Sequence, residues 1–337
     1  MAEIALLACT GHEPIDRALR GIVGAYEAAF PGRVRGYYLL GSYAEGNAVA
    51  VSDVDANVLF ADAFVDAAER ERAEALRRAC DGLSPVRLDL LVRDERSMHP
   101  LDVRLATNAV LLYGEDTRAR LPLPDRLTYQ RQATEAPLHF VVRHLRGGPP
   151  VAFPLDYPDA GGRLLGYDPP GLAAYFYPPG TPGGTKTLVV AACWIATATV
   201  ALATGRMVGG KTEAVRTYRE DVGDEWSGFL EHLHERCRGH WGYQLPADRA
   251  GAAELDGLCR RMLAFENRYL ERHRAFVLDQ LRRSDGEARL FGARRFAWVV
   301  YRDDEVRAAL ARVSDDPEGE VRSAARRARA LDDEGPA

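Results

Sequence analysis

The chain has 337 residues, of which 47% are apolar and 28% charged, and its net charge is −5 at neutral pH. Such proportions are those of a globular protein, and the length predicts two domains with appendages rather than one small core. The net negative charge disfavours a polynucleotide partner, which usually meets a broad basic surface. No apolar run approaches the roughly 18 residues that indicate a membrane span, and the longest candidate, residues 188–203, is rich in Ala and Thr.

The cysteines and the N-terminal residues indicate a cytoplasmic protein. The five cysteines are scattered and show no C-x-x-C spacing. This pattern favours free core thiols in a reducing compartment over a disulfide framework or a zinc site. The first residues lack the basic segment of a signal peptide, so neither secretion nor membrane insertion is expected.

The first predicted elements are a helix and a strand-turn-strand unit. Residues 13–30 carry apolar side chains at helical spacing, which predicts a helix that packs in front of the first strand. In residues 37–60 an apolar run reaches Gly41 and Ser42, and a small-residue segment leads to Ser52-Asp53-Val54-Asp55 and a second apolar run. The unit is predicted to be a strand, a glycine turn, a short helix or loop, and a strand.

Two acids of this unit point to a metal site. Asp53 and Asp55 are two apart on the predicted strand, so their carboxylates share one face. Two like charges side by side repel each other, and a divalent cation removes that repulsion. Carboxylate oxygens suit Mg²⁺, which is commonly held by one or two carboxylates and substrate phosphates. A third acid, Asp89, interrupts the short apolar strand predicted at residues 86–92, where propensity disfavours aspartate.

The remaining elements of the N-terminal part complete a small mixed sheet. Helices are predicted at residues 64–83 and 100–107, and a further strand at 109–113. The acids are expected on one face of this sheet. Glu45 could also lie near the metal ions, although a solvated helix position is the favoured interpretation.

Gly41-Ser42, Asp53-x-Asp55 and the later Asp89 resemble the signature of the DNA polymerase beta-like nucleotidyltransferase superfamily. Within it, the chain is most similar to bacterial aminoglycoside adenylyltransferases of the streptomycin/spectinomycin type. The signature covers residues 35–93, and the segment 111–116 extends the likeness. The resemblance implies that Asp53, Asp55 and Asp89 hold two Mg²⁺ ions, and that Gly41 and Ser42 hold phosphates of ATP.

After residue 120 the strand signals fade, and residues 121–124 are expected to form a hinge. Residues 127–145 predict a helix, whereas 147–185 are rich in Gly, Pro and Tyr and cannot form one regular element. This loop has two interpretations. It is either a substrate-pocket lid, with Tyr175 and Tyr177 in its wall, or a surface insertion that packs on its own aromatic side chains.

An apolar helix is predicted at residues 187–205, with Gly205 as its C-cap. Residues 206–214 then resemble the segment of the adenylyltransferase helical domain whose lysine meets the nucleotide triphosphate. The resemblance gives this role to Lys211, although Gly210 stands where the family usually has Ser. The alternative is a solvated lysine at a helix start.

The expected fold class is an α/β nucleotidyltransferase domain, with a small mixed sheet and helices, followed by an all-α helical bundle. The expected boundaries are 1–120 for the catalytic domain, 125–280 for the helical substrate and nucleotide domain, and 281–337 for an accessory helical tail. The oligomeric state is left open.

The implied reaction is Mg²⁺-dependent transfer of a nucleoside monophosphate, AMP from ATP by resemblance, to a hydroxyl of a small acceptor such as an aminoglycoside antibiotic. Pyrophosphate is released, and the general base is either Asp89 or a second-domain glutamate such as Glu135. Two alternatives stay open. The acceptor could be tRNA or a protein, as in toxin-like or regulatory members, or the chain could be a non-catalytic NTP-binding partner.

Overall fold

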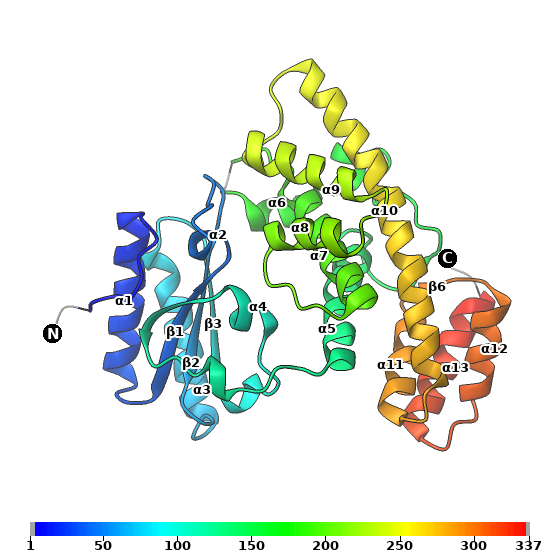
Figure 1. Cartoon of the computed structure of the whole chain (residues 1–337), viewed down its shortest axis with the longest axis horizontal. Helices are drawn as coiled ribbons and strands as arrows, with labels where there is room; N and C mark the ends of the chain where they lie inside the picture. Colours follow the sequence, from blue (N-terminus) through cyan, green and yellow to red (C-terminus); the bar gives the residue numbers. More distant parts are fainter. Residues whose placement is uncertain (1–3, 179, 335–337) are drawn as a thin grey trace. The chain divides into compact units, whose positions relative to one another are not determined.

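The computed structural model describes residues 4–178 and 180–334 (Figure 1). The chain divides into two compact units. Unit 1 comprises Met1–Thr128 and the later segment Met207–Glu213, and unit 2 comprises Tyr129–Arg206 and Ala214–Ala337. The predicted boundaries differ from this division in three places. Residues 125–128 and 207–213 cluster with the N-terminal unit, and the tail from residue 281 clusters with the other helices of unit 2.

Unit 1 is built on a four-stranded mixed sheet with the strand order β3-β2-β1-β4. Strands β2 and β3 run parallel, whereas β1 is antiparallel to both β2 and β4. The mixed sheet with helices expected for the N-terminal part is therefore confirmed in this coarse form. Its strands are β1 (Val34–Leu40), β2 (Val54–Phe60), β3 (Leu88–Asp94) and β4 (Val110–Gly114), and its helices are α1 (Glu13–Ala29), α2 (Gly41–Ala44), α3 (Ala67–Cys80) and α4 (Val103–Asn108).

The two faces of the sheet carry two separate cores. On one face, apolar residues of β2 such as Val54 and Val58 pack with side chains of α1 and α3. On the opposite face, Leu59 packs with Met98 and with Leu105 of α4. Because side chains alternate along a strand, Asp55 shares the α4 face with Leu59. The apolar pattern of β2 thus directs its acid away from the larger core.

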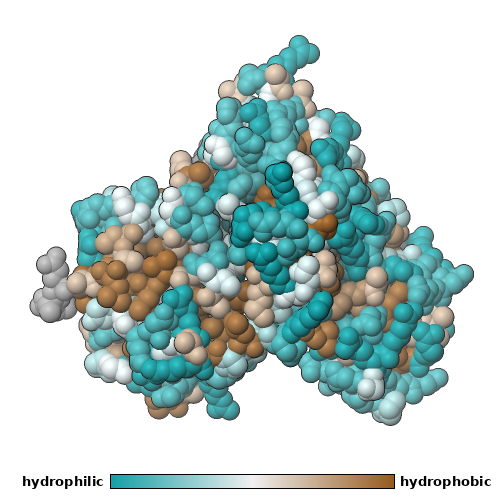
Figure 2. All heavy atoms as spheres, in the orientation of Figure 1, coloured by the Kyte–Doolittle hydropathy of each residue, from teal (hydrophilic) through white to brown (hydrophobic). Residues whose placement is uncertain are grey.

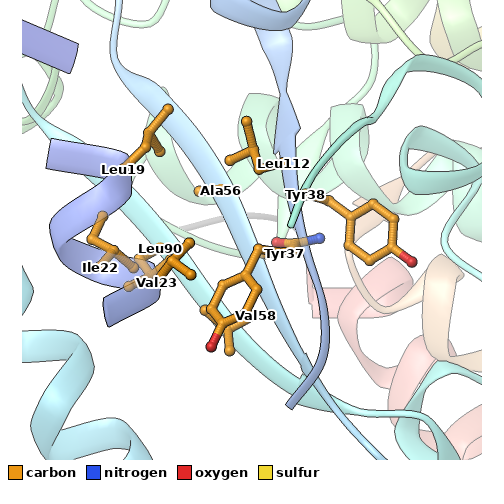
Figure 3. Close-up of a pocket in the computed structure, with 10 residues that line it drawn as sticks. Leu19, Ile22, Val23, Tyr37, Tyr38, Ala56, Val58, Leu90 and Leu112 are labelled. Atoms are coloured by element: carbon orange, nitrogen blue, oxygen red, sulfur yellow. The ribbon is translucent and has the colours of Figure 1, made fainter. Parts of the chain in front are cut away.

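A small cavity lies in the larger core, between α1 and the sheet (Figure 3). Leu19, Ile22 and Val23 of α1 face Val58 and other strand residues there. The lining is apolar apart from the Tyr37 and Tyr38 hydroxyls and Asn57, and it includes none of the predicted site residues. We interpret this cavity as a gap in core packing.

Unit 2 is largely helical, as expected for the C-terminal part. Its longest helix, α10, has 34 residues and packs against α7, α11 and α12. Buried residues such as Leu255, Leu258 and Met262 recur along α10 at helical spacing, and Figure 2 shows hydrophilic side chains over its visible surface. The helices are α5 (Arg126–His139, continued by a π-helix Phe140–His144), α6 (Pro170–Phe176), α7 (Lys186–Thr204), α8 (Lys211–Asp221), α9 (Ser227–His234, continued by a π-helix Glu235–His240), α10 (Arg249–Arg282), α11 (Gly286–Phe296), α12 (Asp304–Val313) and α13 (Gly319–Glu334).

The tail is integrated into unit 2. Helices α11 and α12 each pack on α10 and on α13 (Figure 1). The short strand β6 (Val299–Val300) pairs in parallel with β5 (Val151–Ala152), which lies in the Gly- and Pro-rich region. These contacts tie residues far apart in the sequence, so the helical tail forms part of the same packed body.

Helix α7 is long and apolar enough to cross a membrane by length and composition, and 72% of its most apolar window is buried in the structure. Such burial is common for the core helix of a globular protein. The predicted end of this helix is confirmed, because Gly205 adopts the left-handed conformation, with φ of 77°, and its N–H donates to the Ala201 carbonyl.

The aromatic side chains of residues 147–185 differ sharply in burial. Tyr177 is 4% exposed, and its hydroxyl donates to the Tyr243 carbonyl (2.8 Å) and accepts from the Lys186 N–H (2.9 Å). Tyr175 is 48% exposed. Tyr177 is therefore a core residue bonded to backbone groups outside the loop, which disfavours a lid with both tyrosines in a pocket wall.

Tyr177→Phe is expected to lower the free energy of unfolding by about 1–3 kcal/mol, because the buried Lys186 N–H loses its partner and the Tyr243 carbonyl keeps only the bond from the Thr185 N–H. Tyr175→Ala should stay within about 0.5 kcal/mol of the wild type, since its side chain is largely exposed. Urea unfolding of the two variants checks this. Equal destabilisation by both changes would contradict the placement of Tyr177 in the core.

Candidate active site

The site begins where β1 ends beside β2. Leu40, the last residue of β1, is paired with Asp55, and Gly41 follows with a φ of 66°. A Cβ at position 41 would collide with the Asp55 carboxylate. Only glycine combines this left-handed conformation with so close an approach. The glycine of the predicted turn therefore makes room for the acid.

The parallel pairing of β2 and β3 brings the acids together. Asp55 and Asp89 are direct partners in the register, so they lie on adjacent strands roughly 4.8 Å apart and share one face. Asp53 immediately precedes β2, two residues from Asp55. Asp55 and Asp89 thus lie side by side on the face of the sheet that carries α4, and Asp53 comes directly before β2.

Partial burial and the two neighbouring acids shift the pKa of Asp55. Burial and the negative charges of Asp53 and Asp89 together raise the pKa of the Asp55 carboxyl to about 6, although the positive charges of Lys211 and Arg104 act in the opposite direction. A carboxyl in this state disfavours its own charge at neutral pH. A bound cation would remove that penalty.

The acids do not form a complete metal centre from protein ligands alone. Within residues 4–178 and 180–334, no group of three or more His, Cys, Asp or Glu side chains is gathered closely enough to hold a metal ion. The donor set still fits Mg²⁺, which takes one or two carboxylates and fills its other positions with water and phosphate oxygens. Asp55 is half-buried and lies beside two other acids, so its carboxylate is the one that a bound cation would stabilise most.

Two serines lie next to the acids. Ser42 is half-buried in the short helix α2, and its carbonyl accepts the Asn47 N–H (2.9 Å). Ser52 is 5% exposed and its hydroxyl accepts the Val49 N–H (2.9 Å), which fixes the turn into Asp53. Sequence reasoning named Ser42 and missed the structural role of Ser52. A serine directly before an acid pair, after a small-residue segment, was the available signal.

The segment Met207–Glu213 brings Lys211 into unit 1. Lys211 is the first residue of α8, and its positive charge acts on Asp55. The position expected for a serine is glycine for a steric reason, because a Cβ at Gly210 would collide with the Glu45 and Asn108 side chains. Among the predicted site residues, Gly41, Asp53, Asp55, Asp89 and Lys211 are therefore gathered in one region.

Two further residues differ from the prediction, one a candidate general base and the other an arginine near Asp55. Glu135 forms an ion pair with Arg295 within unit 2, which gives this glutamate a structural partner. The positive charge of Arg104 lowers the pKa of Asp55, and this arginine was not predicted because an exposed arginine on a short helix belongs to no motif.

No family model matches the chain, and no curated protein sequence matches it.

Proposed function

We propose that the chain is a Mg²⁺-dependent nucleotidyltransferase that moves a nucleoside monophosphate, AMP from ATP, onto a hydroxyl of a small molecule. The observation that carries the proposal is the pairing of Asp55 with Asp89 beside Asp53, with Lys211 delivered to the same region from far along the chain. Crowded acids beside one lysine suit a ligand that is itself a metal-bound polyanion.

The roles of the residues follow from their chemistry. Asp53 and Asp55 would hold both ions and Asp89 one of them, and Mg²⁺ would supply charge neutralisation and polarisation of phosphoryl oxygens. The backbone and hydroxyl groups at Gly41 and Ser42 would hold the β and γ phosphates. Lys211 would stabilise the negative charge that develops on pyrophosphate.

The proposed transfer exchanges one bond at the α-phosphorus for another and needs no oxidant or reductant. The acceptor hydroxyl oxygen forms a bond to the α-phosphorus, and the bond from that phosphorus to the bridging oxygen of the β-phosphate breaks. Pyrophosphate leaves with that electron pair. Asp89 is the group that accepts the hydroxyl proton, because Glu135 is paired with Arg295 in unit 2.

The proposed acceptor class is a small polyhydroxylated molecule, and an aminoglycoside is the first candidate because of the motif resemblance. The net charge of −5 supports a small cationic acceptor over an RNA. Pyrophosphate release measured with purified protein, Mg²⁺ and each NTP, across a panel of aminoglycosides and bulk tRNA, tests the proposal. Release with ATP and one aminoglycoside is the expected result. Release with tRNA alone would overturn the acceptor class, and absence of both release and Mg·ATP binding would overturn the reaction.

A further inference from the structure

A pair of side chains outside the acid cluster joins two elements of unit 1. Glu45 caps the end of α2, and Asn108 is the last residue of α4. The Asn108 Nδ2 donates to Glu45 Oε1 (3.1 Å), and the Asn47 Nδ2 donates to Glu45 Oε2 (2.9 Å). Both oxygens of this surface carboxylate are therefore held in place by amides.

The segment that carries Lys211 rests directly on this pair. A Cβ at Gly209 would lie 2.8 Å from the Asn108 Cγ, and a Cβ at Gly210 would lie 3.4 Å from the Glu45 Cδ and collide with its Oε1. The two glycines thus let the backbone touch the pair. A segment with side chains at these positions would have to lie further away.

The segment is also fixed from its own side. The Gly209 N–H donates to the Glu213 carboxylate (2.9 Å) across the first turn of α8, and Val208 is 4% exposed. Lys211 lies between Gly209 and Glu213, one residue after the contact with Glu45. Its position therefore depends on where Glu45 and Asn108 hold the backbone.

We propose that Glu45 and Asn108 are positioning residues that act as a latch, defined by these two side chains and the backbone of Gly209 and Gly210, and that the latch places Lys211 for the triphosphate. The inference rests on the proposed nucleotide-binding function. Each hydrogen bond between exposed side chains contributes little to stability, so the latch can open locally without unfolding the sheet.

Hydrogen exchange of the peptide that covers residues 207–213 tests the latch without any nucleotide. Asn108→Ala and Glu45→Ala should make this peptide exchange several-fold faster, while peptides of β1 and β2 stay unchanged. Glu45→Gln is the conservative variant, since its amide oxygen can still accept from Asn108, and its exchange should stay near the wild-type rate. Unchanged exchange in both alanine variants would overturn the latch.

Calorimetric titration with Mg·ATP tests whether the latch acts through Lys211. Asn108→Ala and Lys211→Ala should each weaken binding by roughly tenfold or more, and the double variant should be no weaker than Lys211→Ala alone. Losses that multiply in the double variant would overturn the positioning role. The wild type could fail to bind Mg·ATP while hydrogen exchange of residues 207–213 still responds to Asn108→Ala. In that case the proposed function is wrong, whereas the contact of Glu45 and Asn108 with this segment is supported.

Discussion

Asp55→Asn is expected to lower the rate of nucleotidyl transfer by about three orders of magnitude or more. Asparagine keeps the shape of the side chain and removes the charge that would hold the metal ions. Several kcal/mol of transition-state stabilisation depend on that charge, and each 1.4 kcal/mol corresponds to roughly a factor of ten. Single-turnover release of pyrophosphate, with the acceptor identified from the panel, measures the loss. A rate within tenfold of the wild type would contradict the metal assignment.

The same substitution should stabilise the metal-free protein at neutral pH. Burial and the neighbouring acids raise the pKa of Asp55 from its ordinary value of 3.8 to about 6. The folded state therefore binds this proton more tightly than the unfolded state. The resulting cost to stability is absent below about pH 4, grows between about pH 4 and 6, and is fully present above about pH 6. Above that range Asp55→Asn should gain roughly 1–3 kcal/mol over the wild type, and near pH 4 the gain should vanish.

Asp94, at the end of β3, provides a matched control of opposite sign. Burial alone would raise the pKa of Asp94, but hydrogen bonds from the Phe64 N–H and from Ser97 lower it overall. Asp94→Asn should therefore lose stability at neutral pH. Thermal unfolding of both variants in EDTA, at about pH 4 and pH 8, tests the pair. Destabilisation by Asp55→Asn at pH 8 would contradict the claim that the charge of Asp55 destabilises the metal-free fold.

Lys211→Ala is expected to weaken Mg·ATP binding by roughly 10- to 100-fold, because a charge-assisted contact to a phosphate contributes about 1.5–3 kcal/mol. Lys211→Arg keeps the charge but changes its geometry, so it should lose less affinity than the alanine variant. Calorimetric titration with Mg·ATP measures both.

The control for Lys211 lies on the same helix. Arg216 on α8 has a 55% exposed side chain that pairs with Glu220. Arg216→Ala removes a positive charge that pairs with Glu220 on the same helix, and the affinity of this variant should match the wild type. Equal losses of Mg·ATP affinity in Lys211→Ala and Arg216→Ala would contradict a direct contact between Lys211 and the phosphates.

The sequence was most informative where local pattern and chemistry agree. Apolar runs broken by Asp55 and Asp89 predicted two strands with acids on one face, because the period of a strand fixes the side of every second residue. The register that makes these two residues direct partners could not be predicted, since pairing depends on long-range packing.

Contacts between residues far apart in the sequence, and the burial of individual side chains, could not be predicted for the same reason. Glu45 and Asn108 are far apart in the sequence, and neither carries a motif, so their contact with Gly209 and Gly210 required the folded chain. Tyr177 was grouped with Tyr175 by composition, although one is buried and the other exposed. The segment 207–213 was assigned to the helical domain because its neighbours in the sequence are helices, whereas it clusters with the sheet.

The most direct test of the acid cluster is a calorimetric titration of ATP into the wild type and into Asp55→Asn, with Mg²⁺ and with EDTA. Saturable one-site binding that requires Mg²⁺ and is lost in Asp55→Asn is the expected result. Absence of binding, or binding that is equal with EDTA and in the variant, would contradict a metal–nucleotide site at Asp53, Asp55 and Asp89.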